Sequence, residues 1–235
     1  MSPETVLMSV EAFLAETFNF RLHVIIAYLP FFIKGTLLTI WISLAGVIVG
    51  TVLGLMIGLG KMSSNFFIRL PFVWYINFFR GTPLLVQILL IHFGLMPMLM
   101  SPVNSTASII VALALNSAAY IAEIFRAGIQ SIDRGQMEAA RSLGMTHTQA
   151  MRYIILPQAF KRMVPPLGNE FIILLKESSL GAIIAVPELM YWGRAAQAQY
   201  FAVWEPYLMA ALIYLTLTLS LTHLLNYIER RMKTE

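Results

Sequence analysis

The sequence predicts an all-α integral membrane protein with five transmembrane helices. Of its 235 residues, 58% are hydrophobic and only 12% are charged. A chain this apolar cannot cover the surface of an ordinary soluble domain with polar side chains. A helix needs about 20 apolar residues to cross the hydrocarbon layer of a membrane. Apolar stretches of that length occupy residues 32–60, 66–100, 108–130, 163–186 and 207–227.

The positions of the basic residues predict how these helices are oriented. Lys and Arg are concentrated in the cytoplasmic loops of membrane proteins. With five spans, one side of the membrane would hold 11 of the 16 Lys and Arg residues. They are Lys61, Arg69, Arg126, Arg134, Arg141, Arg152, Lys161, Arg162, Arg230, Arg231 and Lys233. We therefore expect the amino terminus outside and the carboxyl terminus in the cytoplasm.

Residues 1–31 are expected to form an amphipathic segment at the outer membrane surface. Their first 20 residues contain Glu4, Glu11 and Glu16 but no Lys or Arg, so they lack the basic start of a secretory signal peptide. Apolar residues recur there at helical spacing, which favours an interfacial helix over disorder. Residues 32–235 form the predicted membrane domain.

Composition and spacing argue against several classes of function. The chain has no Cys, which excludes disulfides, thiolate metal ligands and Cys nucleophiles. Its four His residues lack the His-Glu-x-x-His spacing of a zinc enzyme, so no metal site is expected. Membrane topology explains the net positive charge, and nucleic acid is not an expected partner. Gly60-Lys61 lacks the flanking residues of a phosphate-binding loop, so no ATP site is expected in this chain.

The first predicted helix carries a seam of glycines. Gly46, Gly50, Gly54 and Gly58 recur at every fourth residue. This spacing places them on one helix face, where another backbone can approach closely. We expect a tight helix–helix contact along this face, although the spacing does not identify the partner helix.

The second apolar stretch is expected to break near Thr82. Pro83 removes one backbone hydrogen bond, and Gly81 adds conformational freedom. Arg80 is costly in lipid, so it is expected to face protein or a water-filled path. Alternatively, Arg80 anchors the helix by bonding the carbonyl groups that the break frees. Thr82 and Gln87 are the stronger candidates to face a polar path.

The third stretch presents a polar stripe. Asn116, Tyr120 and Glu123 are spaced by four and three residues, so they share one helix face. Glu123 is expected to pair with Arg126, three residues further on. Asn116 lies deeper, where a helix–helix hydrogen bond and a substrate contact are equal alternatives.

A polar, basic segment at about residues 131–157 separates the third and fourth stretches, and we call it the bracket. Gly144 can adopt the left-handed conformation that ends a helix beginning near residues 132–133. Thr146 and Gln149 have the spacing of a capping box at the start of a second helix. The bracket is therefore predicted to be a helix–turn–helix unit outside the lipid.

Pro157 is expected to end the second helix of the bracket or to bend it where the chain returns to the membrane. The bracket is also expected to present a small apolar surface. The residues of this surface are Ala139, Ala140, Leu143 and Met145.

The bracket contains Glu138-Ala-Ala, then Gly144 after three further residues, and Ile154-x-Leu-Pro after nine more. This spacing resembles the EAA loop of ATP-binding-cassette (ABC) importer permeases. Two further segments, 79–83 and 120–128, are similar to those of the polar amino-acid branch of these permeases. The likeness covers roughly residues 35–231.

The resemblance implies a type I ABC importer permease fold in a prokaryotic inner membrane. It implies two permease subunits, identical or homologous, two cytoplasmic ATPase subunits, and an extracellular or periplasmic amino-acid-binding protein. ATP and Mg would be bound by the ATPase, and this chain would bind no cofactor and catalyse no reaction. In the bracket, Glu138 and Arg141 would contact the ATPase, and Gly144 would set the angle between the helices. Ala139 and Ala140 would permit close approach.

Glu170 is the residue most informative about the substrate. A carboxylate at membrane depth requires a cationic partner or a proton. In relatives that take arginine, lysine or histidine, the resemblance implies a carboxylate near this point. The alternative is an internal ion pair with Lys176 or Arg80. Asn169 and Ser178 are further candidate contacts.

The predicted function is ATP-driven uptake of a polar amino acid, with a basic amino acid favoured. The predicted substrate contacts are Glu170, Asn169, Asn116, Tyr120, Thr82, Gln87, Arg80 and Ser178. The alternative is a permease for glutamine or another neutral or acidic amino acid. A stand-alone channel or secondary transporter is a different class, and it would have no need for the bracket.

Overall fold

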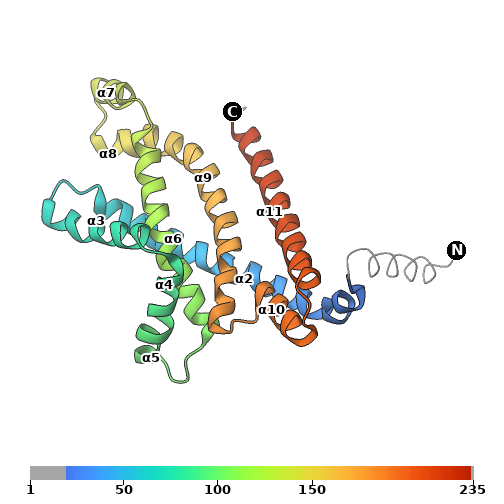
Figure 1. The fold of residues 1–235 in the computed structure, drawn as a ribbon. Helices are drawn as coiled ribbons and strands as arrows, with labels where there is room; N and C mark the ends of the chain where they lie inside the picture. The colour runs from blue at the N-terminus through green and yellow to red at the C-terminus, as the bar shows by residue number, and fades with distance from the viewer. Residues whose placement is uncertain (1–19, 234–235) are drawn as a thin grey trace.

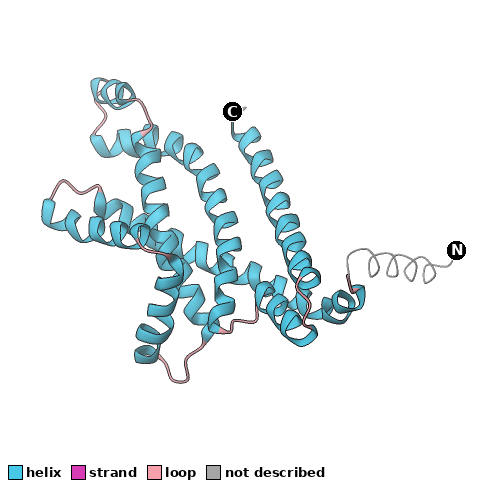
Figure 2. Ribbon diagram, viewed as in Figure 1, coloured by secondary structure: helices cyan, strands magenta, loops and turns pink. Residues whose placement is uncertain are grey.

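The computed structural model describes residues 20–233, and this part of the chain is built from helices and loops without a strand (Figures 1 and 2). The α-helices are α2 (Leu22–Lys61), α3 (Phe66–Gly81), α4 (Leu84–Leu89), α5 (Met96–Leu99), α6 (Ser105–Gln130), α7 (Arg134–Ser142), α8 (His147–Ala150), α9 (Leu156–Glu177), α10 (Leu189–Tyr200) and α11 (Trp204–Lys233). Two π-helical turns, η1 (Leu90–Leu95) and η2 (Met151–Ile155), and a 3-10 helix, η3 (Ser178–Ile184), connect some of them.

Three of the described helices, α2, α6 and α11, are long and apolar enough to cross a membrane. The segments 66–81 and 84–99 form a bent pair that provides a fourth crossing if the pair is one span. The predicted span 163–186 does not meet the same standard, because α9 carries polar and basic residues and α-helical geometry ends before Ser178. The all-helical fold is confirmed, and the number of five spans stays a prediction.

The first helix is longer than expected. α2 contains 40 residues and begins at Leu22, ten residues before the predicted start at residue 32. Residues 22–31 therefore continue directly into the first membrane helix. The remainder of the predicted interfacial segment, residues 1–19, lies outside the described residues.

The glycine seam of α2 packs against α6. A Cβ atom added at Gly46 would lie 3.1 Å from Cβ of Leu113, and one added at Gly54 would lie 2.8 Å from Cβ of Ile121. The eight-residue step along α2 matches an eight-residue step along α6, so the two helices run parallel. Their carboxyl-terminal ends therefore lie at the same end of the bundle, which is the end that leads into the bracket.

The other long helices return in alternating directions. Gly128 near the end of α6 lies against Met163 near the start of α9, and Gly168 of α9 lies against Leu225 of α11. At the opposite end of α11, Glu205 accepts a hydrogen bond from the backbone N–H of Arg21 at 2.8 Å. The described chain thus begins beside the start of α11 and finishes at its other end (Figure 1).

Candidate functional site

The predicted break in the second apolar stretch is confirmed. α3 ends at Gly81, α4 begins at Leu84, and the helical segments on either side of the break are bent by 110°. Thr82 and Pro83 between them have extended backbone angles, with ψ of 148° and 136°. The break leaves carbonyl groups at the end of α3 without helical partners.

Gln87 supplies the missing donors at this break. Its side chain is almost fully buried, and Nε2 donates to the carbonyl oxygens of Phe79 at 2.9 Å and Thr82 at 3.0 Å. Its Oε1 accepts a hydrogen bond from Nδ2 of Asn116 in α6 at 2.9 Å. Gln87, rather than Arg80, therefore bonds two of the carbonyl groups at the break, and the Thr82 hydroxyl donates to the carbonyl oxygen of Phe78 at 2.8 Å. The structure brings together Thr82, Gln87 and Asn116, and their role as substrate contacts stays a prediction.

Replacing Gln87 with leucine is expected to destabilise the permease by about 1–3 kcal/mol, because the Asn116 amide and the freed carbonyl groups lose their partner in a buried place. The thermal unfolding midpoint of the purified complex measures this effect. The control is Val86→Leu at the adjacent, exposed position. Equal midpoints for the two variants would show that the Gln87 hydrogen bonds contribute no stability.

Arg80 and Tyr120 form an accessible polar pair. The guanidinium carbon of Arg80 lies 5.3 Å from the centre of the Tyr120 ring, and its Nη1 lies 3.8 Å from Oε2 of Glu123. The Arg80 side chain is 44% exposed and Tyr120 is 37% exposed. Of the predicted contacts on α3 and α6, these two retain surface that a substrate or partner could reach.

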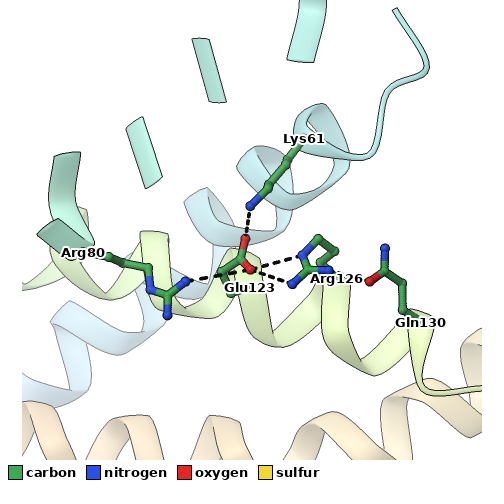
Figure 3. Close-up of polar contacts among 5 residues, drawn as sticks. All are labelled: Lys61, Arg80, Glu123, Arg126 and Gln130. Carbon is green, nitrogen blue, oxygen red and sulfur yellow. Dashed lines mark hydrogen bonds and ion pairs between the residues drawn. The ribbon is translucent and has the colours of Figure 1, made fainter. Parts of the chain in front are cut away.

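Glu123 is the centre of an ion-pair cluster (Figure 3). Its Oε2 accepts hydrogen bonds from Nη2 of Arg126 at 2.8 Å and from Nε at 3.1 Å, which confirms the expected pair. Its Oε1 accepts a hydrogen bond from Lys61 at the end of α2. The sequence did not indicate the Lys61 contact, because 62 residues separate the two side chains.

The predicted substrate contacts around Glu170 differ in their exposure to solvent. Glu170 is only 5% exposed, whereas the adjacent Asn169 is exposed. In residues 20–233 no ion pair joins Glu170 to Lys176 or Arg80, so the alternative of an internal pair with these residues is not borne out. The hydroxyl of Ser178 is buried and donates to the carbonyl oxygen of Leu175 at 2.8 Å, next to the end of α9.

The two helices of the bracket form as predicted. Asp133 caps α7, and its carboxylate accepts a hydrogen bond from the backbone N–H of Gly135 at 2.7 Å. Gly144 has a left-handed φ of +84°. The predicted capping box is confirmed, because the Thr146 N–H donates to Gln149 Oε1 at 2.8 Å and the Gln149 N–H donates to Thr146 Oγ1 at 3.3 Å.

The apolar surface of the bracket differs from the prediction. Ala140 is only 4% exposed, because the segment formed by α8 and η2 folds back against α7 and covers it. Leu143 is 84% exposed, Ala139 is exposed and Met145 is half-buried. The prediction that Ala140 lies on the surface was wrong, and Leu143 dominates the apolar area instead.

Two other features of the bracket bear on earlier expectations. Glu138 and Arg141 are exposed on α7, and Nη1 of Arg141 donates to the carbonyl oxygen of Met145 at 2.8 Å. The helix does not end at Pro157, because the π-helical turn η2 joins α8 to α9 without a loop. Pro157 falls in the first turn of α9, where its missing N–H is tolerated.

Sequence reasoning missed the buried carboxylate Glu188. It caps α10, and it accepts hydrogen bonds from the N–H groups of Met190 at 2.9 Å and Tyr191 at 2.7 Å. It also accepts the hydroxyl hydrogen of Tyr214 in α11 at 2.9 Å. Glu is not among the preferred helix caps, and Tyr214 is distant in sequence, so no local signal marked this residue.

Comparison with known proteins gives a consistent result. Residues 50–234 match the family model of the binding-protein-dependent transport system inner membrane component. The arginine transport system permease protein ArtQ of Bacillus subtilis is 39% identical over 220 residues, which cover 92% of this chain and 99% of that protein. The glutamine transport system permease protein GlnP of Escherichia coli is 39% identical over 207 residues, which cover 87% and 94%.

Solved structures agree with this result. A crystal structure described as an amino acid ABC transporter with histidines has a chain that is 48% identical, with a TM-score of 0.84, and the match covers 88% of this chain and 96% of that one. The MetNI methionine ABC transporter in an inward-facing conformation is 20% identical with a TM-score of 0.75, and this likeness shows the fold alone.

The described helices form an apolar bundle with a broken second segment and a polar bracket, which is the architecture of a multi-helix membrane protein. The chain belongs to the family of binding-protein-dependent transport system inner membrane components, and within it to the permeases of polar amino-acid ABC importers. In this family, ATP hydrolysis takes place in a separate subunit. Family membership implies ATPase and binding-protein partners and a location in the bacterial inner membrane.

Proposed function

We propose that this chain is the permease subunit of an importer for basic amino acids, with Glu170 as the contact for the cationic side chain of the substrate. The observation that carries the proposal is the burial of this carboxylate without an ion pair to Lys176 or Arg80 in the described chain. A buried carboxylate requires a cation or a proton, and a cationic substrate would satisfy that need during transport.

The relatives leave two substrate classes open. One relative is named for arginine transport and another for glutamine transport, and both are 39% identical to this chain. Sequence identity therefore does not separate a cationic substrate from a neutral one. The buried Glu170 favours the cationic class, since a neutral amide would leave the carboxylate without a counter-charge.

We propose that the bracket couples this subunit to two ATPase subunits, which bind ATP and Mg. Exposed charges at Glu138 and Arg141 beside the apolar Leu143 and Ala139 give the mixture of polar and apolar groups that a protein contact needs. In this arrangement a second permease subunit completes the membrane path, and each subunit contributes five spans. The amino terminus is external and the carboxyl terminus is cytoplasmic.

Glu170→Gln is expected to reduce arginine- or lysine-stimulated ATP hydrolysis at least about tenfold, because an amide replaces the proposed counter-charge and the lost interaction exceeds about 1.4 kcal/mol. Glutamine-stimulated hydrolysis should fall much less. The assay uses the permease, ATPase and binding protein together in lipid vesicles, with a panel of basic, acidic and neutral amino acids. Assembly of each variant is checked by size-exclusion chromatography.

The matched control is Glu205→Gln, which alters another buried carboxylate at the end of the bundle opposite the bracket. It should change the responses to all amino acids in the same proportion. Equal losses of arginine and glutamine responses in Glu170→Gln would contradict the role of Glu170. A wild-type response to glutamate alone would contradict the cationic substrate class itself.

A further inference from the structure

A basic cavity lies between α2, α3 and α6, at the end of the bundle that carries the bracket. Its volume is about 650 Å³, and its lining includes Lys61, Ser63, Arg69 and Arg126. Three of its seven lining residues are positively charged, and none is negatively charged. A cavity with this charge balance is suited to an anion.

The carboxylates of the protein neutralise only part of the positive charge around this cavity. Glu123 is the carboxylate beside the cavity, and it is shared by Lys61, Arg126 and Arg80. Figure 3 shows Lys61 and Arg126 approaching it from different sides. Arg69 on the cavity wall has no carboxylate partner within residues 20–233. Glu123 pairs with three cations, and Arg69 adds a fourth positive charge that Glu123 does not pair, so the net charge around the cavity is positive.

The surroundings of the cavity are those expected near a membrane boundary. The parallel packing of α2 and α6 places it on the same side as the polar bracket. The first turn of α3 borders this region with exposed apolar side chains, and Phe66 and Phe67 are 56% and 81% exposed. A basic pocket between membrane helices with apolar neighbours fits a lipid that has a charged headgroup and apolar chains.

We propose that this cavity binds the phosphate headgroup of an anionic phospholipid. Arg69 and Arg126 donate to the phosphate oxygens, Ser63 adds a hydroxyl donor, and the acyl chains lie along the exposed face of α3. The position between membrane helices distinguishes this site from the ATPase contact, which falls on the bracket. The proposal concerns the membrane environment of the permease and is independent of the amino acid transported.

The test uses the delipidated complex of the permease with its ATPase subunits. The complex is offered equal amounts of phosphatidylglycerol and phosphatidylcholine, and bound lipid is counted by native mass spectrometry. Phosphatidylglycerol should be retained in preference, and Arg69→Gln should weaken its binding about fivefold. Arg69→Lys should keep wild-type binding, because it preserves the charge.

The control is Lys161→Gln, which removes an exposed positive charge on α9 that does not line the cavity. Phosphatidylglycerol binding to this variant should match the wild type. Equal retention of the two lipids, or equal binding by Arg69→Gln and Lys161→Gln, would overturn the proposal. Binding of inorganic phosphate by the complex without any preference for phosphatidylglycerol would point to a free-anion site and overturn the proposal. Complete absence of lipid from the complex would show that the ATPase covers the cavity, and would also overturn it.

Discussion

Gly54→Ile is expected to prevent assembly of a stable transporter. Even a Cβ atom at this position would lie 2.8 Å from Cβ of Ile121 and 2.9 Å from the carbonyl oxygen of Ala118. The second contact is with backbone, so rotation of a side chain cannot relieve it. Overpacking of this kind typically costs about 1–3 kcal/mol, and a whole isoleucine between two membrane helices should reach or exceed the upper value.

The yield of monodisperse complex after detergent extraction measures this effect, together with its thermal unfolding midpoint. Gly94→Ile is the matched control, because a Cβ atom added at Gly94 has no neighbour within 4 Å. The control should assemble at nearly the wild-type yield. Similar yields and midpoints for the two variants would show that the α2–α6 contact is looser than the structure indicates.

The second large effect is expected at Gly144, where substitution should uncouple ATP hydrolysis from substrate. Its φ of +84° is rarely adopted by residues with a side chain, and a β-branched residue is a strong outlier there. Gly144→Val should therefore change the angle between α7 and α8. Substrate-stimulated ATP hydrolysis is expected to fall to the basal rate, while the membrane helices remain folded.

Gly144→Asn separates the effect of backbone conformation from that of side-chain size. Asn adopts left-handed conformations more readily than other residues, and no neighbour lies within 4 Å of a Cβ atom at this position. This variant should retain most of the stimulated hydrolysis. If Gly144→Asn and Gly144→Val lose activity equally, the side chain itself blocks the ATPase contact, and the backbone explanation is wrong.

The features that could be predicted from sequence depend on residues close together in the chain. The capping box joins residues three apart. The left-handed turn depends only on the conformational freedom of Gly144, and Pro83 was enough to indicate the helix break. The glycine seam also followed from spacing within one helix. Local steric and hydrogen-bonding rules act on short segments, so a short segment of sequence contains the necessary information.

The features that were missed or misjudged depend on distant contacts. Glu188 meets Tyr214 in α11, and Lys61 meets Glu123 across 62 residues. The exposure of Ala140 was misjudged, because the segment that folds back after the turn covers this residue. Gln87 and Asn116 were correctly singled out as polar groups in apolar helices, but the hydrogen bond between them is a property of the tertiary fold.

The glycine seam has a mechanical consequence for transport. A Cβ atom at Gly46 or Gly54 would lie 3.1 Å or 2.8 Å from an atom of α6, which is closer than an ordinary van der Waals contact, so α2 and α6 pack tightly along this face. If α2 slid along α6, it would have to advance by a full four-residue repeat, about 6 Å, before its glycines again faced the same side chains of α6. Small shifts are therefore blocked, and α2 and α6 should move as a single strut. A displacement that begins at the bracket would then reach Arg21 and Glu205 at the far end of the molecule as a tilt of the whole strut.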